Sequence, residues 1–190
     1  MKSSFTYRIT ATAILLALSV LIRFIGSLPF SLNPIGLIIT GSLLCAAMIF
    51  ASTKIGVLSG LSVCLVCPVF DYVFRIYDSA AAIPIQMAGN ILFVLVSGFF
   101  FMLMKRVKQT VIVEKVVLVF GVCAATCIRS TLMSAAVRYM IPIMNLSISE
   151  TIVYDFGTPQ LVTGIIGGTA AVIIVSLLQK KEEKQAVQVQ

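Results

Sequence analysis

Six apolar stretches dominate the sequence, and each is long enough to cross a lipid bilayer as a helix. They run for 16 to 25 residues, and about 20 helical residues cross roughly 30 Å of hydrocarbon. We therefore expect an all-α membrane protein, a six-transmembrane-helix bundle that forms one domain over residues 1–190. The helices are expected at approximately 9–28, 35–52, 55–70, 80–104, 116–140 and 158–178, with room for the third to continue through Tyr72 to Phe74.

The composition narrows the functions open to such a bundle. Hydrophobic residues make up 59% of the chain and charged residues 11%, which leaves no soluble module beside the membrane domain. No GxxxxGK[ST] phosphate loop is present, so energy for any transport has to come from a partner. The chain has no histidine, which removes Ser/His/Asp chemistry, histidine-ligated zinc and imidazole proton relays. We expect no catalysis, cofactor, metal site or nucleic-acid partner.

The cysteines all lie inside apolar stretches, where a thiol usually behaves as a small buried hydrophobe. They are Cys45, Cys64, Cys67, Cys123 and Cys127. Cys64 and Cys67 form a CxxC motif, but no second ligand pair or flanking polar residue accompanies it. We expect packing roles and no disulfide.

The basic residues indicate the orientation, because Lys and Arg in short loops accumulate on the cytoplasmic side. With the N-terminus and the C-terminus both inside, ten of the 14 basic residues fall in cytoplasmic segments. The expected outer loops are 29–34, 71–79 and 141–157, and little more than Thr53 and Lys54 joins the second helix to the third. The charged residues of the outer segments are Asp71, Asp78, Glu150, Asp155, Arg75 and Arg138.

Two arginines lie at membrane depth, where a charged side chain is costly and is retained mainly where it pairs or meets a ligand. Arg129 is expected in the outer half of the fifth helix, roughly 13 Å from Arg138 and too deep to reach the surface easily. Its partner is either Asp155, just before the last helix, or the carboxylate or phosphate of a ligand. Arg23 lies closer to the outer surface, and we expect it to reach the lipid headgroups.

Uncharged polar residues gather in the outer halves of the last three helices. Gln86 and Asn90 are four residues apart, which places both amides on one face of the fourth helix, with Ser97 continuing the stripe. They suit a neutral heterocycle and interhelical hydrogen bonds equally well. The last helix opens with a polar entrance made of Tyr154, Asp155, Thr158, Pro159, Gln160 and Thr163. This asymmetry predicts an outer-side ligand pocket in the C-terminal half of the chain.

Three pairs of small residues, each four positions apart, allow helix backbones to approach closely in lipid. Ordinary packing within the bundle explains any one pair at least as well as a subunit contact does. The first helix has few polar groups before Arg23, so we expect its smooth face to suit another membrane subunit. The pairs are Ala13 and Ala17, Gly56 and Gly60, and Gly164 and Gly168.

In length, helix number and orientation, the chain resembles the substrate-binding S components of energy-coupling factor (ECF) transporters, the vitamin importers of bacteria and archaea. Its segment Ala13-Ile14-Leu15-Leu16-Ala17 looks like the AxxxA surface on which these proteins dock a transmembrane coupling subunit. The resemblance implies that Ala13 and Ala17 contact that subunit. It also implies that the loop from Ser27 to Pro34, which contains Asn33, closes over the ligand, and that the last three helices supply the site.

By this resemblance, the chain is a multi-pass protein of the bacterial cytoplasmic membrane that captures a vitamin or related micronutrient from outside. A coupling subunit and two ATPase subunits would then support its delivery inward. Without an Asp155 partner, Arg129 favours a ligand with a carboxylate or phosphate, such as pantothenate, biotin, niacin or a folate. The candidate substrate-binding residues are Asn33, Gln86, Asn90, Arg129, Tyr154, Asp155 and Gln160.

Three other functions compete with this interpretation. A non-transporting scaffold, such as the six-helix membrane subunit of rod-shape-determining complexes, would use the polar cluster structurally, and saturable ligand binding separates it from an S component. An enzyme of lipid metabolism is disfavoured, because the chain lacks histidine and a DxxDGxxAR-like acidic motif. A channel or small exporter is disfavoured because no ring-forming series of charges lines any helix.

Overall fold

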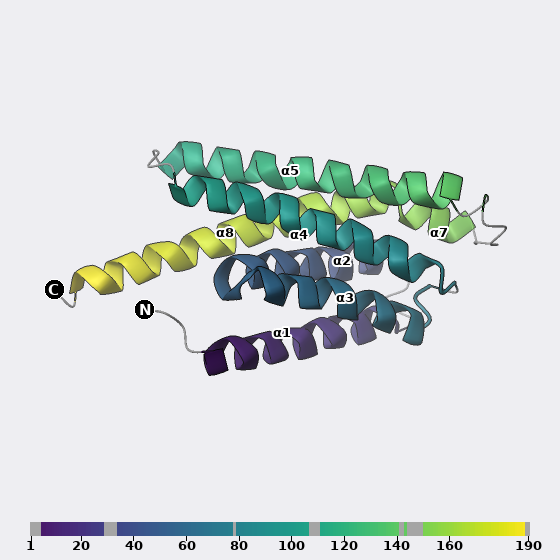
Figure 1. The fold of residues 1–190 in the computed structure, drawn as a ribbon, viewed down its shortest axis with the longest axis horizontal. Coiled ribbons are helices and arrows are strands. Elements are labelled where there is room, and N and C mark those ends of the chain that lie inside the picture. The colour runs from purple at the N-terminus through teal and green to yellow at the C-terminus, as the bar shows by residue number, and fades with distance from the viewer. Residues whose placement is uncertain are drawn as a thin grey trace.

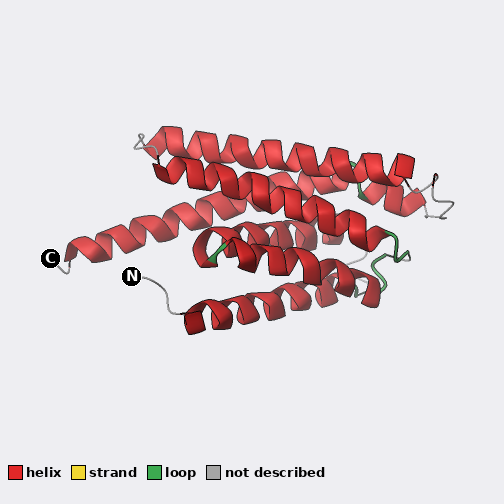
Figure 2. Cartoon of the chain, in the orientation of Figure 1, coloured by secondary structure: helices red, strands yellow, loops and turns green. Residues whose placement is uncertain are grey.

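The computed structural model describes residues 5–28, 34–77, 79–106, 111–140, 143 and 150–188, and all regular structure within them is helical (Figure 2). Two π-helical segments, η1 (Ala51–Ile55) and η2 (Ala136–Met140), continue the helices that precede them. The α-helices are α1 (Phe5–Gly26), α2 (Pro34–Phe50), α3 (Val57–Val73), α4 (Ala82–Arg106), α5 (Val111–Ala135), α7 (Glu150–Asp155) and α8 (Thr158–Gln188).

The six predicted apolar stretches all form helices. Within the described residues, five helical spans are long and apolar enough to cross a membrane, and α3 is a shorter apolar helix. The chain is therefore a multi-pass helical membrane protein. Three helices differ most from the prediction at their ends: α1 begins at Phe5 rather than Ile9, α5 begins at Val111 rather than Val116, and α8 continues to Gln188 rather than stopping at Leu178. The expected outer loop 141–157 also contains a helix, α7. The added α8 residues are mostly Lys, Glu, Gln and Ala, which favour helix beyond the apolar stretch.

The connection between α2 and α3 is shorter than predicted. Thr53 and Lys54, expected as the loop, belong to η1, and only Gly56 separates η1 from α3. Gly56 has φ of 150°, a backbone conformation that side chains disfavour and that glycine adopts readily. This one residue therefore turns the chain back on itself.

The helices lie side by side along the long axis of the bundle (Figure 1). α1 begins and α8 ends at the same end, which we call the terminal end, and α7 lies at the opposite end, which we call the α7 end (Figure 1). α8 packs against α2 and α5, α5 packs against α4, and α4 packs against α3. α1 contacts α2 and α3 and forms one edge of the bundle.

Glycines allow α8 to approach its neighbours closely. A Cβ added to Gly164 would meet Thr126 of α5, and one added to Gly168 would meet Val122 of the same helix. A Cβ on Gly167 would meet the backbone of Ser42 in α2. The pair Gly164 and Gly168 therefore serves packing within the bundle.

α1 is much less buried than the other spanning helices. Of its most apolar window, 17% is buried, compared with 50% for the span Ile35–Ile55. Ala13 and Ala17 are both exposed on its surface. Ala13 lines a groove of about 520 Å³ between the first half of α1 and the start of α3. A hydrogen bond of 2.7 Å between the hydroxyls of Thr12 and Ser59 crosses from one helix to the other there.

Candidate substrate-binding site

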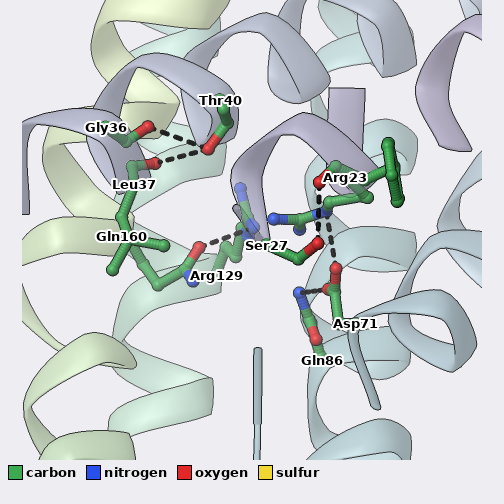
Figure 3. Close-up of polar contacts among 10 residues, drawn as sticks. Arg23, Ser27, Gly36, Leu37, Thr40, Asp71, Gln86, Arg129 and Gln160 are labelled. Carbon is green, nitrogen blue, oxygen red and sulfur yellow. Dashed lines mark hydrogen bonds and ion pairs between the residues drawn. The ribbon is translucent and has the colours of Figure 1, made fainter. Parts of the chain in front are cut away.

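Buried polar side chains gather at the α7 end of the bundle (Figure 3). Successive helices run in opposite directions, so residues from the last turn of one helix meet residues from the first turns of the next. None of the five central side chains is more than 9% exposed. They are Arg23 of α1, Asp71 of α3, Gln86 of α4, Arg129 of α5 and Gln160 of α8.

Arg23 and Asp71 form a buried ion pair. Arg23 Nε lies 2.8 Å from Asp71 Oδ1, and the two side chains are 7% and 0% exposed. Gln86 Nε2 donates a hydrogen bond of 2.7 Å to the other carboxylate oxygen (Figure 3). Two expectations are corrected: Arg23 points into the bundle rather than to the headgroups, and Asp71 lies within α3 rather than in an outer loop. Each charge compensates the cost of burying the other.

Arg129 is buried among neutral groups. It is 2% exposed, and its Nη2 donates a hydrogen bond of 2.7 Å to Gln160 Oε1 (Figure 3). Its Nη1 donates to Cys45 Sγ at 3.0 Å, and its Cζ lies 5.3 Å from the centre of the Phe93 ring, a cation–π contact. Its Nε has no hydrogen-bond partner within the described residues.

The alternative that Arg129 pairs with Asp155 is not what the structure shows. Within the described residues, Arg23 and Asp71 form an ion pair, whereas no carboxylate lies within 4.0 Å of the Arg129 guanidinium. The Arg129 guanidinium is therefore held by an amide, a thiol and a ring, and it has no ion-pair partner within 4.0 Å among the described residues.

The two amides on α4 have different surroundings. Gln86 contacts Asp71 of α3, which is an interhelical hydrogen bond of the kind expected. Asn90, one turn further, is fully buried, and neither its amide nitrogen nor its amide oxygen has a partner in the described part of the chain. Ser97 hydrogen-bonds the Phe93 carbonyl of its own helix. Asn90 therefore keeps a free donor and a free acceptor inside the bundle.

A small cavity lies between the two arginines. Its volume is about 40 Å³, which has room for a few water molecules. Arg23 and Arg129 line it together with Asp155 and Gln160, so charged groups of both signs face one space. The remaining lining residues are Leu37, Gly41, Leu44, Ile76, Tyr77, Pro159 and Thr163.

Aromatic residues cover this cavity at the α7 end. Tyr77, in the turn after α3, lies edge-on to Phe156, with ring centres 5.3 Å apart. Both side chains are buried in a cluster with Met133, Val137 and Ile152. Burial raises the pKa of Tyr77, so its hydroxyl stays neutral.

Not every candidate residue reaches the cavity. Arg129, Asp155 and Gln160 line it, whereas Gln86 and Asn90 lie behind its wall on α4 and are absent from its lining. Tyr154 is 64% exposed and does not line it, because consecutive residues of a helix point about 100° apart. Asn33 lies outside the described residues.

Sequence reasoning missed four residues at this site: Arg23, Asp71, Tyr77 and Cys45. Arg23 was assigned to the headgroups because it lies close to the outer end of its apolar stretch, and Asp71 was assigned to an outer loop. Opposite charges at the same end of two apolar stretches could have suggested the pair. Nothing in the sequence distinguishes Cys45 of α2, which accepts from Arg129, from the two buried thiols of α3, Cys64 and Cys67.

All five cysteines are free thiols. No group of three or more Cys, Asp or Glu side chains in the described part of the chain is arranged to hold a metal ion. Comparison of the chain with known protein families, with curated proteins and with solved structures finds no match.

Proposed function

We propose that this protein is the substrate-binding S component of an ECF-type importer and binds a vitamin or related micronutrient at the α7 end of the bundle. In this proposal the α7 end faces the outside of a bacterial cytoplasmic membrane, and both termini face the cytoplasm. A transmembrane coupling subunit and two ATPase subunits supply the energy.

The observation that carries the proposal is the environment of Arg129. Its guanidinium lines a cavity, is 2% exposed and has only neutral partners within the described residues. A buried charge without a counter-charge is expensive, and such groups in membrane helices mark ligand or ion sites by default. A ligand carboxylate or phosphate would supply the missing negative charge and form bidentate hydrogen bonds with the guanidinium.

The exposure of α1 supports the proposal that a transmembrane coupling subunit docks on this helix. A helix with a weakly buried surface and exposed Ala13 and Ala17 can let a neighbouring helix approach closely. The groove of about 520 Å³ beside Ala13 is lined mainly by apolar side chains and includes Gly56 and Leu58 of the neighbouring turn. A coupling subunit would cover this surface while the ligand cavity at the other end stays accessible.

Ligand binding is tested first, because an S component binds a small molecule and a scaffold does not. The full chain is purified in mild detergent, the small molecules released on denaturation are identified by mass spectrometry, and each is titrated back onto the protein. A stoichiometric vitamin or precursor with sub-micromolar affinity is expected. A protein that releases nothing and binds no member of a vitamin panel is instead a membrane scaffold, with the buried polar residues serving only its structure.

The docking surface is tested separately by enlarging it. Ala13→Trp and Ala17→Trp are expected to block uptake in cells that contain the coupling module, while ligand affinity stays unchanged. Ala88→Trp is the matched control, because Ala88 is also an exposed alanine but lies on α4. Normal uptake in the two α1 variants would remove α1 from the coupling interface.

A further inference from the structure

The cavity at the α7 end is lined by two opposite charges that form no ion pair with each other. Arg23, Arg129 and Asp155 are the charged residues of its lining, and Asp71 is in contact with Arg23. Arg23 Nε and Asp71 Oδ1 lie 2.8 Å apart, so the charges of these two residues compensate each other. Arg129 and Asp155 line the same space, but neither has an ion-pair partner in the described part of the chain.

From this arrangement we infer that the ligand is a small zwitterion, with an acidic group for Arg129 and a basic group for Asp155. The inference rests on the proposed ligand-binding role and adds the substrate class. It does not depend on the coupling subunit or on the ATPases.

The two unpaired charges lie at different depths. Arg129 lies within α5 and is 2% exposed, whereas Asp155 ends α7 and is only partly buried. The acidic group of the ligand therefore binds at the more deeply buried position, next to Arg129 and the amide of Gln160. Its basic group stays near the mouth, within reach of the Asp155 carboxylate.

Other charge types fit this lining less well. A simple monoanion would satisfy Arg129 but bring a second negative charge toward Asp155, and a simple cation would meet two guanidiniums. Charges interact strongly in a water-poor interior, so each mismatch lowers affinity. A net-neutral ligand with separated charges avoids both mismatches and leaves the Arg23–Asp71 pair undisturbed.

The size of the cavity limits the ligand and requires movement. Typical ligand pockets enclose roughly 300 Å³ or more, whereas this cavity has about 40 Å³. Binding therefore has to separate some of the wall. A displacement of the short helix α7 would enlarge the cavity on the side of Asp155, and Phe156 and Gly157 connect this helix to the start of α8 at Thr158.

The test uses ligand triplets that share one carbon skeleton and differ only in charge. They are β-alanine, propionate and ethylamine; phenylalanine, 3-phenylpropionate and phenethylamine; and tryptophan, indole-3-propionate and tryptamine. The full-length protein in mild detergent is heated with each compound at millimolar concentration. At least one amino acid is expected to raise the unfolding midpoint, while its deaminated and decarboxylated counterparts have little effect.

Two variants assign the charges. Asp155→Asn is expected to weaken binding of the amino acid that stabilises the wild type by about tenfold or more. It is also expected to make the deaminated acid the better ligand. Arg129→Gln is expected to abolish the response to both acids. Arg138→Gln and Glu114→Gln are the controls, because both residues lie on the same chain segment as Arg129 but outside the cavity lining. Both controls are expected to respond like the wild type.

Three results would overturn the inference. The first is that no compound of any triplet raises the unfolding midpoint, and the second is that the wild-type protein binds a deaminated acid as tightly as the amino acid. The third is that the Asp155→Asn variant still prefers the amino acid over the deaminated acid. These results are distinct from failure of the proposed function. A co-purified vitamin without a basic group would uphold the S component and reject the zwitterion. Zwitterion binding without any coupling-dependent uptake would uphold the zwitterion as the ligand and reject the S component.

Discussion

Arg23 and Arg129 lie at the same end of the bundle, yet they meet opposite kinds of partner. Arg23 has the carboxylate of Asp71 at 2.8 Å. Arg129 has the amide of Gln160, the thiol of Cys45 and the ring of Phe93. The first arginine is neutralised inside the protein, while the second keeps its charge available. A buried charge in a membrane bundle is therefore interpreted from its partner rather than from its depth.

Removing the carboxylate of the first pair should have the largest effect. Asp71→Asn leaves Arg23 buried and uncompensated, so we expect it to lower the free energy of unfolding by about 3–5 kcal/mol. Unfolding in mixed micelles of increasing SDS content measures the change. Asp155→Asn is the matched control, because that aspartate has no ion pair in the described residues and should change stability by only about 0.5 kcal/mol. Equal losses in the two variants would contradict the structural role of Asp71.

Neutralising the second arginine should cost less stability. Arg129→Gln removes hydrogen bonds from a charged donor, worth about 1.5–3 kcal/mol, but also removes an uncompensated buried charge. We therefore expect a net loss of about 1–2 kcal/mol, together with loss of anion binding in the same preparation. A loss of stability as large as that of Asp71→Asn, with ligand affinity unchanged, would make Arg129 a structural residue like Arg23.

The double variant Arg23→Gln, Asp71→Asn sharpens the comparison further. It replaces the ion pair with two amides, which leaves no charge unpaired, so most of the loss caused by Asp71→Asn should disappear. We expect a net change of about 1 kcal/mol or less, since replacing a whole buried pair is often nearly neutral. A double variant as unstable as the single one would show that the pair does more than cancel charge.

The smallest effect should come from the thiol that accepts from Arg129. Cys45→Ala removes a weak acceptor and a small side chain, while Gln160 still holds the guanidinium. We expect a loss of about 1 kcal/mol, mainly from the lost packing. Cys64→Ala, at a thiol in the same hydrophobic core, is the control. A much larger loss at Cys45 than at Cys64 would show that the thiol contributes strongly to holding Arg129.

The helices could be predicted from sequence because each depends on a local property, a run of apolar residues of sufficient length. The buried positions of Gln86, Asn90, Arg129 and Gln160 also follow from polar residues inside such runs. These features can be predicted without knowing which helices are neighbours.

The pairing of side chains could not be predicted in the same way. Hydropathy left the end of the third helix open between residue 70 and Phe74, because a charge lowers the score of a window. The carboxylate of Asp71 lies within α3, where Arg23 of the adjacent α1 neutralises it. The choice between Asp155 and a ligand anion as the partner of Arg129 likewise depended on the distance between α5 and α7. Whether Tyr154 or Asp155 faced the cavity depended on the rotation of a six-residue helix.

The single residue between η1 and α3 also bears on how the chain enters the membrane during synthesis. A connection this short makes α2, η1 and α3 a helical hairpin, so the insertion of one helix is coupled to that of the other. α3 is the weaker candidate for independent insertion, since it carries Pro68 and, near its far end, the charged Asp71. Its strongly apolar neighbour can offset that cost during entry. With the α7 end outside, as proposed, the carboxylate of Asp71 would cross the membrane before Arg23 is beside it in the folded bundle.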